Sequence, residues 1–273
     1  AVMMGASHAV SGLVAGVATL PWAPVSRPVE QAAWVAAWGG FALIPDMDHA
    51  NGTAARLWGP VTAGPAAAVG AVAGGHREGT HDVGVAPVVV AVLTGLAMLH
   101  PVSTGLVFAL AIGLALAALD PVLPGDQKNS VVNFVLAVAG AVLLVRAGVH
   151  APWLPVAAAG GVVVHALGDL PTQDGVPVPL STLRRGGRRR RLALRLFRTG
   201  YRHPVKVGSE VVGYRMGVEV IVAAVLWVTL IVLLWRHAAV VAPSMPGGVS
   251  FDSWQDFVSG FGGQGGQPGF APK

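Results

Sequence analysis

Histidine and aspartate recur in four short motifs of this chain, each near an end of an apolar segment. The motifs read G-A-S-H-A-V, I-P-D-M-D-H, H-R-E-G-T-H and H-A-L-G-D. Imidazole nitrogens and carboxylate oxygens are the usual side-chain ligands of zinc, manganese and iron. The pattern therefore predicts a metal site, whose candidate ligands are His8, Asp46, Asp48, His49, His76, His81, His165 and Asp169.

The composition indicates a membrane scaffold for these ligands. The chain is 53% hydrophobic and only 11% charged, with a mean hydropathy of +0.63, whereas a soluble domain carries about 25% charge. Backbone polar groups in lipid must be bonded internally, so apolar runs form helices or a closed barrel. Uninterrupted Ala, Val, Leu and Gly runs favour helices, because barrel strands alternate apolar and polar residues. The absence of cysteine excludes thiolate ligands.

Eight apolar segments predict an all-α, polytopic membrane helical bundle. They cover residues 7–24, 29–45, 60–74, 84–99, 102–119, 130–148, 152–168 and 216–236. A spanning helix needs about 20 residues, and the segment 60–74, with Pro65 inside it, would cover only about 22 Å. We expect this segment to be a short re-entrant or interfacial helix, which leaves about seven transmembrane helices. The first segment follows no basic residue and contains His8, which favours a retained helix over a cleaved signal peptide.

Counting crossings predicts that all four motifs meet at one membrane face, provided that 60–74 does not cross. On this topology 14 of the 18 Lys and Arg residues lie on the face of the motifs. The positive-inside rule makes that face cytoplasmic. The prediction is a multi-pass protein of the cytoplasmic (inner) membrane, with its N-terminus and metal site cytoplasmic and its C-terminus outside.

The chain divides, on this interpretation, into a membrane-embedded domain at 1–240 and a Gly-rich tail at 241–273 that we expect to be disordered. An Arg-rich loop at about 176–214 contains R-R-G-G-R-R-R-R. Such a run sets topology and binds anionic lipid headgroups, at about 1 kcal/mol per basic residue near the surface. Nucleic-acid binding is the less favoured alternative, because no aromatic platform accompanies the arginines. The sequence does not indicate an oligomeric state.

Each motif also has a plainer interpretation. His165 and Asp169 are four residues apart and share a helical face, but they could be a packed histidine and a helix-end aspartate. Pro45 predicts a turn for I-P-D-M-D-H, which alone could be a solvated acidic turn. In H-R-E-G-T-H, Arg77 could bind a phosphate with two hydrogen bonds, or it could be an ordinary surface arginine.

Taken together, the motifs resemble a known family, the membrane-bound metal-dependent hydrolases, also described as LexA-binding inner-membrane-associated hydrolases. The resemblance spans roughly residues 4–220 and departs from the family pattern at Glu78, where glycine is usual, and at Asp82, where serine is usual. The matching positions are His8, Pro45, Asp46, Asp48, His49, His76, Arg77, Thr80, His81, His165, Asp169, Thr172 and Gly175. A looser similarity to zinc-dependent phospholipase C and nuclease-type proteins implies phosphoester chemistry.

The resemblance implies a metal-dependent hydrolase at the cytoplasmic membrane face, acting on a phosphoester or another lipid-like amphiphile. The ligand count exceeds one tetrahedral site, so we expect two or more ions, zinc first and manganese second. Arg77 would neutralise phosphate charge, and Glu78 or Asp82 would be the base. Two alternatives stay open, a metal-ion or proton transporter and a membrane anchor that recruits a cytoplasmic partner through the Arg-rich loop.

Overall fold

Helices make up almost all of the regular structure, which confirms the all-α prediction. The computed structural model describes residues 2–76, 78–119, 129–149, 151–170, 175–180, 193–194, 205–207, 210–212 and 216–241. Within these ranges the α-helices are α1 (Val2–Thr19), α2 (Pro28–Phe41), α3 (Thr53–Arg56), α4 (Pro60–Ala73), α5 (Ala86–Ala97), α6 (Pro101–Leu119), α7 (Ser130–Arg146), α8 (Leu154–Asp169) and α9 (Met216–Val241). Each of the eight apolar segments predicted from the sequence overlaps one of these helices, and the largest offset is at α1, which begins and ends five residues before the predicted 7–24.

Shorter elements connect the helices. The 3-10 helices are η1 (Leu20–Trp22), η2 (Ile44–Asp48) and η3 (Gly79–His81). Two antiparallel pairs join β1 (Val176–Pro177) to β2 (Ala193–Leu194) and β3 (Val205–Val207) to β4 (Glu210–Val212). Contacts divide the chain into units Ala1–Leu230 and Ile231–Lys273, and the division falls inside α9. The first unit holds all four motifs.

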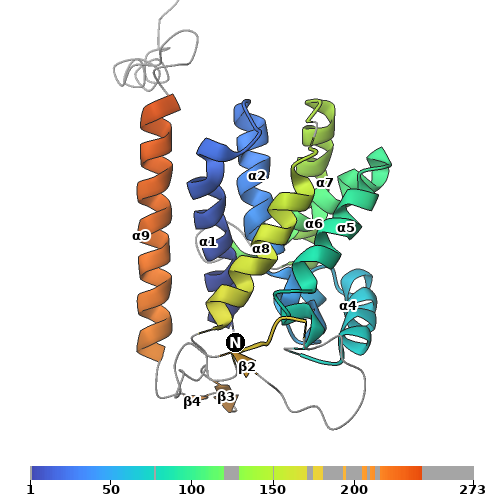
Figure 1. The fold of residues 1–273 in the computed structure, drawn as a ribbon, viewed down its shortest axis with the longest axis vertical. Helices are drawn as coiled ribbons and strands as arrows, with labels where there is room; N and C mark the ends of the chain where they lie inside the picture. Colours follow the sequence, from blue (N-terminus) through green and yellow to red (C-terminus); the bar gives the residue numbers. More distant parts are fainter. Residues whose placement is uncertain are drawn as a thin grey trace, which may run out of the picture. The chain divides into compact units, whose positions relative to one another are not determined.

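Helix α2 is the centre of the bundle, because it packs against α1, α6 and α8 (Figure 1). Helix α5 packs on α8, and α7 packs on α6. At the end of the bundle where α2 stops, a buried cluster joins Ala9 of α1 and Leu43 to Leu114 of α6. Helices α1, α2, α6 and α8 thus each have one end near η2, which carries the I-P-D-M-D-H motif.

Two glycines allow α1 and α8 to approach the backbone of α2 closely. A Cβ atom on Gly12 would lie 2.4 Å from the Trp38 carbonyl oxygen, and one on Gly161 would lie 2.8 Å from the same oxygen. Real Cβ contacts are not this short, so neither position accepts a side chain without moving a helix. Since Gly161 lies one turn before His165, this close approach also determines how near the histidine comes to α2.

Replacing Gly161 by alanine should therefore destabilise the fold by about 1–3 kcal/mol, the usual cost of overpacking. Gly95 of α5 is the matched control, because its Cβ would meet only Pro155, at 3.8 Å. Gly95→Ala should be neutral or mildly stabilising, since alanine favours helix over glycine by about 0.8–1.0 kcal/mol. Thermal unfolding in detergent, followed by tryptophan fluorescence, measures both. Equal melting temperatures for the two variants would contradict the packing argument.

Helix α4 is short and lies at the same end of the bundle as η2 and η3, both of which it contacts (Figure 1). Its 14 residues cover about 21 Å, less than the roughly 30 Å of a hydrocarbon core. Its start is held by Trp58, whose indole N–H donates to the Asn133 side chain at 2.8 Å. The segments before and after α4 also contact each other, so α4 returns the chain to the end where it began.

The outer faces of the helices are strongly apolar. Large exposed side chains on α5, α6 and α7 include Leu93, Leu106 and Leu143, each at least 60% exposed. Apolar surface of this extent is typical of a face that contacts lipid or a partner. By length and composition, α6 is the one helix among the described residues that could cross a membrane on its own; α5, α7 and α8 are apolar but shorter than 18 residues. The structure does not confirm the predicted count of seven crossings.

Candidate metal centre

The structure brings together histidines and aspartates from all four motifs. His8 comes from α1, Asp46 and Asp48 from η2, and His81 from η3, while α8 supplies His165 and Asp169. Three groups have ligand atoms within 4.8 Å of one another. We call them the inner group (His8, His165, Asp169), the central group (Asp46, His81, His165) and the outer group (Asp48, His76, His81). His81 and His165 each belong to two groups, so the three are continuous.

At the centre, the rings of His81 and His165 point their Nε2 atoms at each other, 3.2 Å apart. Both side chains are buried, at 1% and 0% exposure. The Nδ1 atom of His165 lies 2.7 Å from the carbonyl oxygen of Ala42, the residue that ends α2. A carbonyl can only accept, so Nδ1 carries a proton, and in the neutral form of the ring, the form that binds metal, Nε2 presents a lone pair.

His81 is oriented in the same way by a side chain. Its Nδ1 atom lies 3.0 Å from the Thr80 hydroxyl, which itself donates to the Asp48 carboxylate. Because that hydroxyl proton is used, the Thr80 oxygen accepts from the protonated Nδ1 of His81. When both rings are neutral, their Nε2 atoms face each other with lone pairs. Such a contact in a buried site is stabilised by a cation between the two nitrogens, either a proton shared as a hydrogen bond or a metal ion that replaces it.

Carboxylates flank this histidine pair, and the distances between their oxygens and the two Nε2 atoms suit ligands of one metal ion. Oδ1 of Asp46 lies 3.8 Å from both Nε2 atoms, and Oδ2 of Asp169 lies 3.5 Å from both. Ligands on a tetrahedral zinc at about 2.0–2.1 Å are separated by about 3.4 Å. The donor set of two imidazoles and carboxylates therefore fits zinc in type and in spacing. Manganese, which prefers oxygen-rich sites, fits the same residues less closely.

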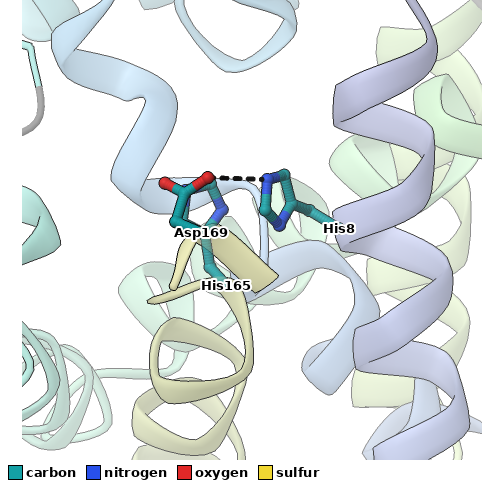
Figure 2. A group of neighbouring side chains, drawn as sticks. All are labelled: His8, His165 and Asp169. Atoms are coloured by element: carbon teal, nitrogen blue, oxygen red, sulfur yellow. Dashed lines mark ion pairs between the residues drawn. The ribbon is translucent and has the colours of Figure 1, made fainter. Parts of the chain in front are cut away.

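The inner group extends the cluster toward α1. Figure 2 shows His8 facing Asp169 and His165 at the end of α8, with the ion pair between His8 Nε2 and Asp169 Oδ1 at 3.5 Å. The rings of His8 and His165 stack with centroids 3.9 Å apart. His8 is 7% exposed, so it is buried together with these two residues. It contacts a candidate ligand directly.

The outer group lies toward solvent. Nδ1 of His76 lies 2.8 Å from Oδ1 of Asp48, and the His76 side chain is 37% exposed while that of Asp48 is fully buried. Oδ2 of Asp48 lies 3.5 Å from Nδ1 of His81. Asp48 thus contacts both histidines of this group. With Nδ1 of His81 protonated, Asp48 can bind an ion together with His76, or orient His81 through Thr80 in the way that a carboxylate supports a metal-binding histidine.

The titratable groups in the turns are in the protonation states that metal binding requires. Burial alone would raise the pKa of Asp46, but His165 and the other neighbouring imidazoles hold it below its usual value. Burial also opposes ionisation of Asp48, and hydrogen bonds from His76 and His81 nevertheless keep its pKa well below the usual range. Burial lowers the pKa of His81. Ionised carboxylates and a neutral imidazole are the forms that bind metal.

The remaining predicted site residues lie at the edge of the cluster or outside the described residues. His49 belongs to none of the three groups; its ring packs against that of His76 at 4.8 Å, and its Nδ1 accepts the amide of Asn51. Glu78 is half-buried at the start of η3. Arg77, Thr172 and most of the Arg-rich loop lie outside the described residues, as does the tail after residue 241.

Asp82 is fully buried, and its carboxylate holds the backbone of two segments together. Oδ1 accepts the amides of Gly84 and Leu180, both at 2.9 Å. Leu180 has a left-handed backbone conformation, with φ of 63°, which is unusual for leucine. Asp82 therefore pins residues 175–180 against the turn that follows η3, and this arrangement favours a positioning role over that of a base.

Asp82→Ala should lower stability by about 1–3 kcal/mol per amide left without its acceptor, because both amides lose a partner. We expect the bound metal per chain to stay at the wild-type value, since Asp82 belongs to none of the three groups. Melting temperature and metal content of the same preparation measure the two effects. Loss of turnover with unchanged melting temperature would instead favour the base that the sequence predicts.

Two groups at the site were not among the residues predicted from the sequence as ligands or catalysts. One is the Ala42 carbonyl, and the other is the Thr80 hydroxyl, which links Asp48 to His81. The last carbonyls of any helix lack partners within the helix, so the end of the segment before Pro45 was a place to expect such an acceptor. Thr80 could have been found from its position beside His81.

Comparison with known proteins supports the membrane location. Residues 3–122 match the family described as YdjM inner membrane protein. No curated protein and no solved structure gave a match. The matched stretch includes His8, Asp46, Asp48 and His81 and ends before α8. The chain is thus similar over residues 3–122 to a family of inner membrane proteins. This similarity supports the prediction that the protein is located in the inner membrane.

Proposed function

We propose that this protein is a membrane-embedded, metal-dependent hydrolase of phosphoester or lipid-like substrates, working at the cytoplasmic face of a bundle with about seven crossings. The observation that carries the proposal is the buried pair of Nε2 atoms of His81 and His165, 3.2 Å apart and flanked by carboxylates. Ionisable groups at membrane depth are costly and usually functional. A cluster of buried ligands for a divalent cation is therefore expected to have a function, and we assign it metal-dependent hydrolysis.

A bound divalent ion would supply Lewis acidity and activated water. The chain's own residues supply the rest. The Ala42 carbonyl and Thr80 fix the rings of His165 and His81, so that the ligand atoms are held before any ion or substrate arrives. Burial of His81 and His165 keeps bulk water from the two rings, which strengthens their electrostatic contacts with a charged substrate.

The direction from which substrate would arrive follows from the gradient of burial. His165 is fully buried, while His76 in the outer group is more than one third exposed. Substrate would therefore approach from the side of η2 and η3, where α4 lies. Helix α4 is apolar and too short to cross, so it suits the lipid–water interface, where an amphiphile presents its headgroup.

In hydrolysis of a phosphoester, water oxygen bonds to phosphorus as the ester oxygen leaves, and the leaving alkoxide takes up a proton. Arg77 and Glu78 adjoin His76 in sequence. We propose that Arg77 binds the phosphate oxygens and that Glu78 acts as the general base that takes the proton from water. Asp82 is the less favoured base, because its carboxylate already accepts two amides. The Arg-rich loop would hold anionic headgroups near the site.

The test is a screen of phospholipid and soluble phosphoester substrates with zinc, with manganese and with chelator. Activity should require metal, should be lost on chelation and should return with metal. Glu78→Gln should lower turnover by about 10²–10⁴-fold, the usual contribution of a general base, with unchanged metal content. Deleting 184–198 separates hydrolysis from an anchor role, because activity on a soluble phosphoester, which needs no headgroup contact with the loop, should survive in the enzyme. Metal-dependent counterflow in proteoliposomes without hydrolysis would favour the transporter.

A further inference from the structure

An apolar groove lies between α6 and α7, apart from the metal cluster. Its volume is about 400 Å³, and all of its lining side chains except one are apolar. Ala109 and Ala141 form its buried floor, and the more exposed Val102, Leu106 and Val142 form its rims. The groove therefore opens on the outer surface of the bundle, where the helices contact lipid.

Small residues make this groove. Gly105 and Ala109 lie four apart on one face of α6, opposite Ala141 of α7, so no side chain fills the space between the helices. A Cβ atom built on Gly105 meets no other atom within 4 Å. The space beside Gly105 is therefore open, and a larger side chain at this position would occupy part of the groove.

The one charged lining residue lies at an end of the groove. The two helices run in opposite directions, since the lining begins with Pro101 and Val102 where α6 starts and ends with Val145 and Arg146 where α7 stops. The Arg146 side chain is exposed, and no described residue forms an ion pair with it. Leu114 of α6 packs at the metal end, so Pro101 lies about 20 Å away along the helix.

We infer that this groove binds one anionic phospholipid, with an acyl chain along Gly105 and Ala109 and the headgroup phosphate on Arg146. An apolar channel that opens to lipid excludes polar occupants, and a guanidinium at its end selects a phosphate or other anion. The inference rests on the membrane location and not on the proposed hydrolase activity. The site lies at the opposite end of α6 from the metal cluster, so it is a separate binding site.

Native mass spectrometry of the purified full chain tests this inference, with equimolar phosphatidylglycerol and phosphatidylcholine of identical acyl chains. The wild type should retain one phosphatidylglycerol with roughly fivefold higher occupancy than phosphatidylcholine, as one basic residue at the interface predicts. Arg146→Gln should abolish that preference and keep some binding of both lipids. Gly105→Leu should fill the groove and lower the occupancy of both lipids.

Gly64→Leu is the matched control, because Gly64 of α4 also has no atom near its Cβ, and α4 packs on η2 and η3 and lines no part of the groove. It should bind lipid like the wild type. A monodisperse Gly105→Leu protein with wild-type lipid occupancy would overturn the inference, as would a phosphatidylglycerol preference that survives in Arg146→Gln. A dimer in the wild type that Gly105→Leu dissociates would also overturn it, by assigning the groove to a second copy.

Discussion

Replacing His165 by alanine should remove bound metal from the central group and lower the rate of the proposed hydrolysis by more than about 100-fold. Loss of a residue that merely orients a ligand already costs about 10–100-fold in metal affinity or activity, so loss of a ligand atom should exceed that. His165 contacts His81, Asp169 and the ring of His8. Its removal therefore disturbs the inner and central groups together.

His100 is the control for this substitution. It is an exposed histidine just before α6, and its Nδ1 accepts the Val102 amide at the end of that helix remote from the metal cluster. His100→Ala should keep wild-type metal content and activity. Metal bound per chain, measured by mass spectrometry of the purified protein, compares the two variants. Equal metal content in both variants would show that His165 is not a metal ligand.

Asp48→Asn should have a different effect, the loss of the outer ion with retention of the central one. Asp48 is the carboxylate of the outer group, and through Thr80 it also orients His81. The metal content should fall by one equivalent, and affinity for the remaining ion should fall about 10–100-fold. Competition with a fluorescent chelator measures both quantities in one titration.

Thr80→Val separates the two roles of Asp48, because valine has nearly the shape of threonine but no hydroxyl. The Thr80→Val variant should keep every ligand atom and therefore bind both metal ions. It should lose only the hydroxyl that orients His81. Glu30→Gln, at the start of α2 beside Arg27, removes a carboxylate remote from η2 and should change neither quantity. If Asp48→Asn kept full stoichiometry with reduced affinity, like Thr80→Val, Asp48 would orient ligands without binding an ion.

The helices and the meeting of the motifs could be predicted from the sequence, because both follow from periodicity and length. His165 and Asp169 share a helical face by their spacing, and the shortness of 60–74 already indicated that the chain returns to the same end. Conformations in the turns could not be predicted. In H-R-E-G-T-H the two histidines are five residues apart, a spacing that does not put them on one helical face, and only the structure shows both beside Asp48.

The roles of individual carboxylates were harder to predict for a related reason. Asp82 and Asp48 are both acidic residues in turns near apolar helices, and composition treats them alike. Their environments differ, because one carboxylate meets backbone amides and the other meets imidazole rings. The tautomers of His81 and His165 likewise depend on a hydroxyl and on a carbonyl whose positions only the packing of η2, η3 and α8 determines.

The most direct test of the metal centre is anomalous diffraction from crystals of the metal-loaded protein, recorded above and below the zinc and manganese absorption edges. We predict a peak between the Nε2 atoms of His81 and His165, within about 2.0–2.2 Å of its nitrogen and carboxylate ligands. Crystals soaked with chelator should lose the peak. An absent peak in metal-loaded crystals, with the two Nε2 atoms still in contact, would contradict the metal centre.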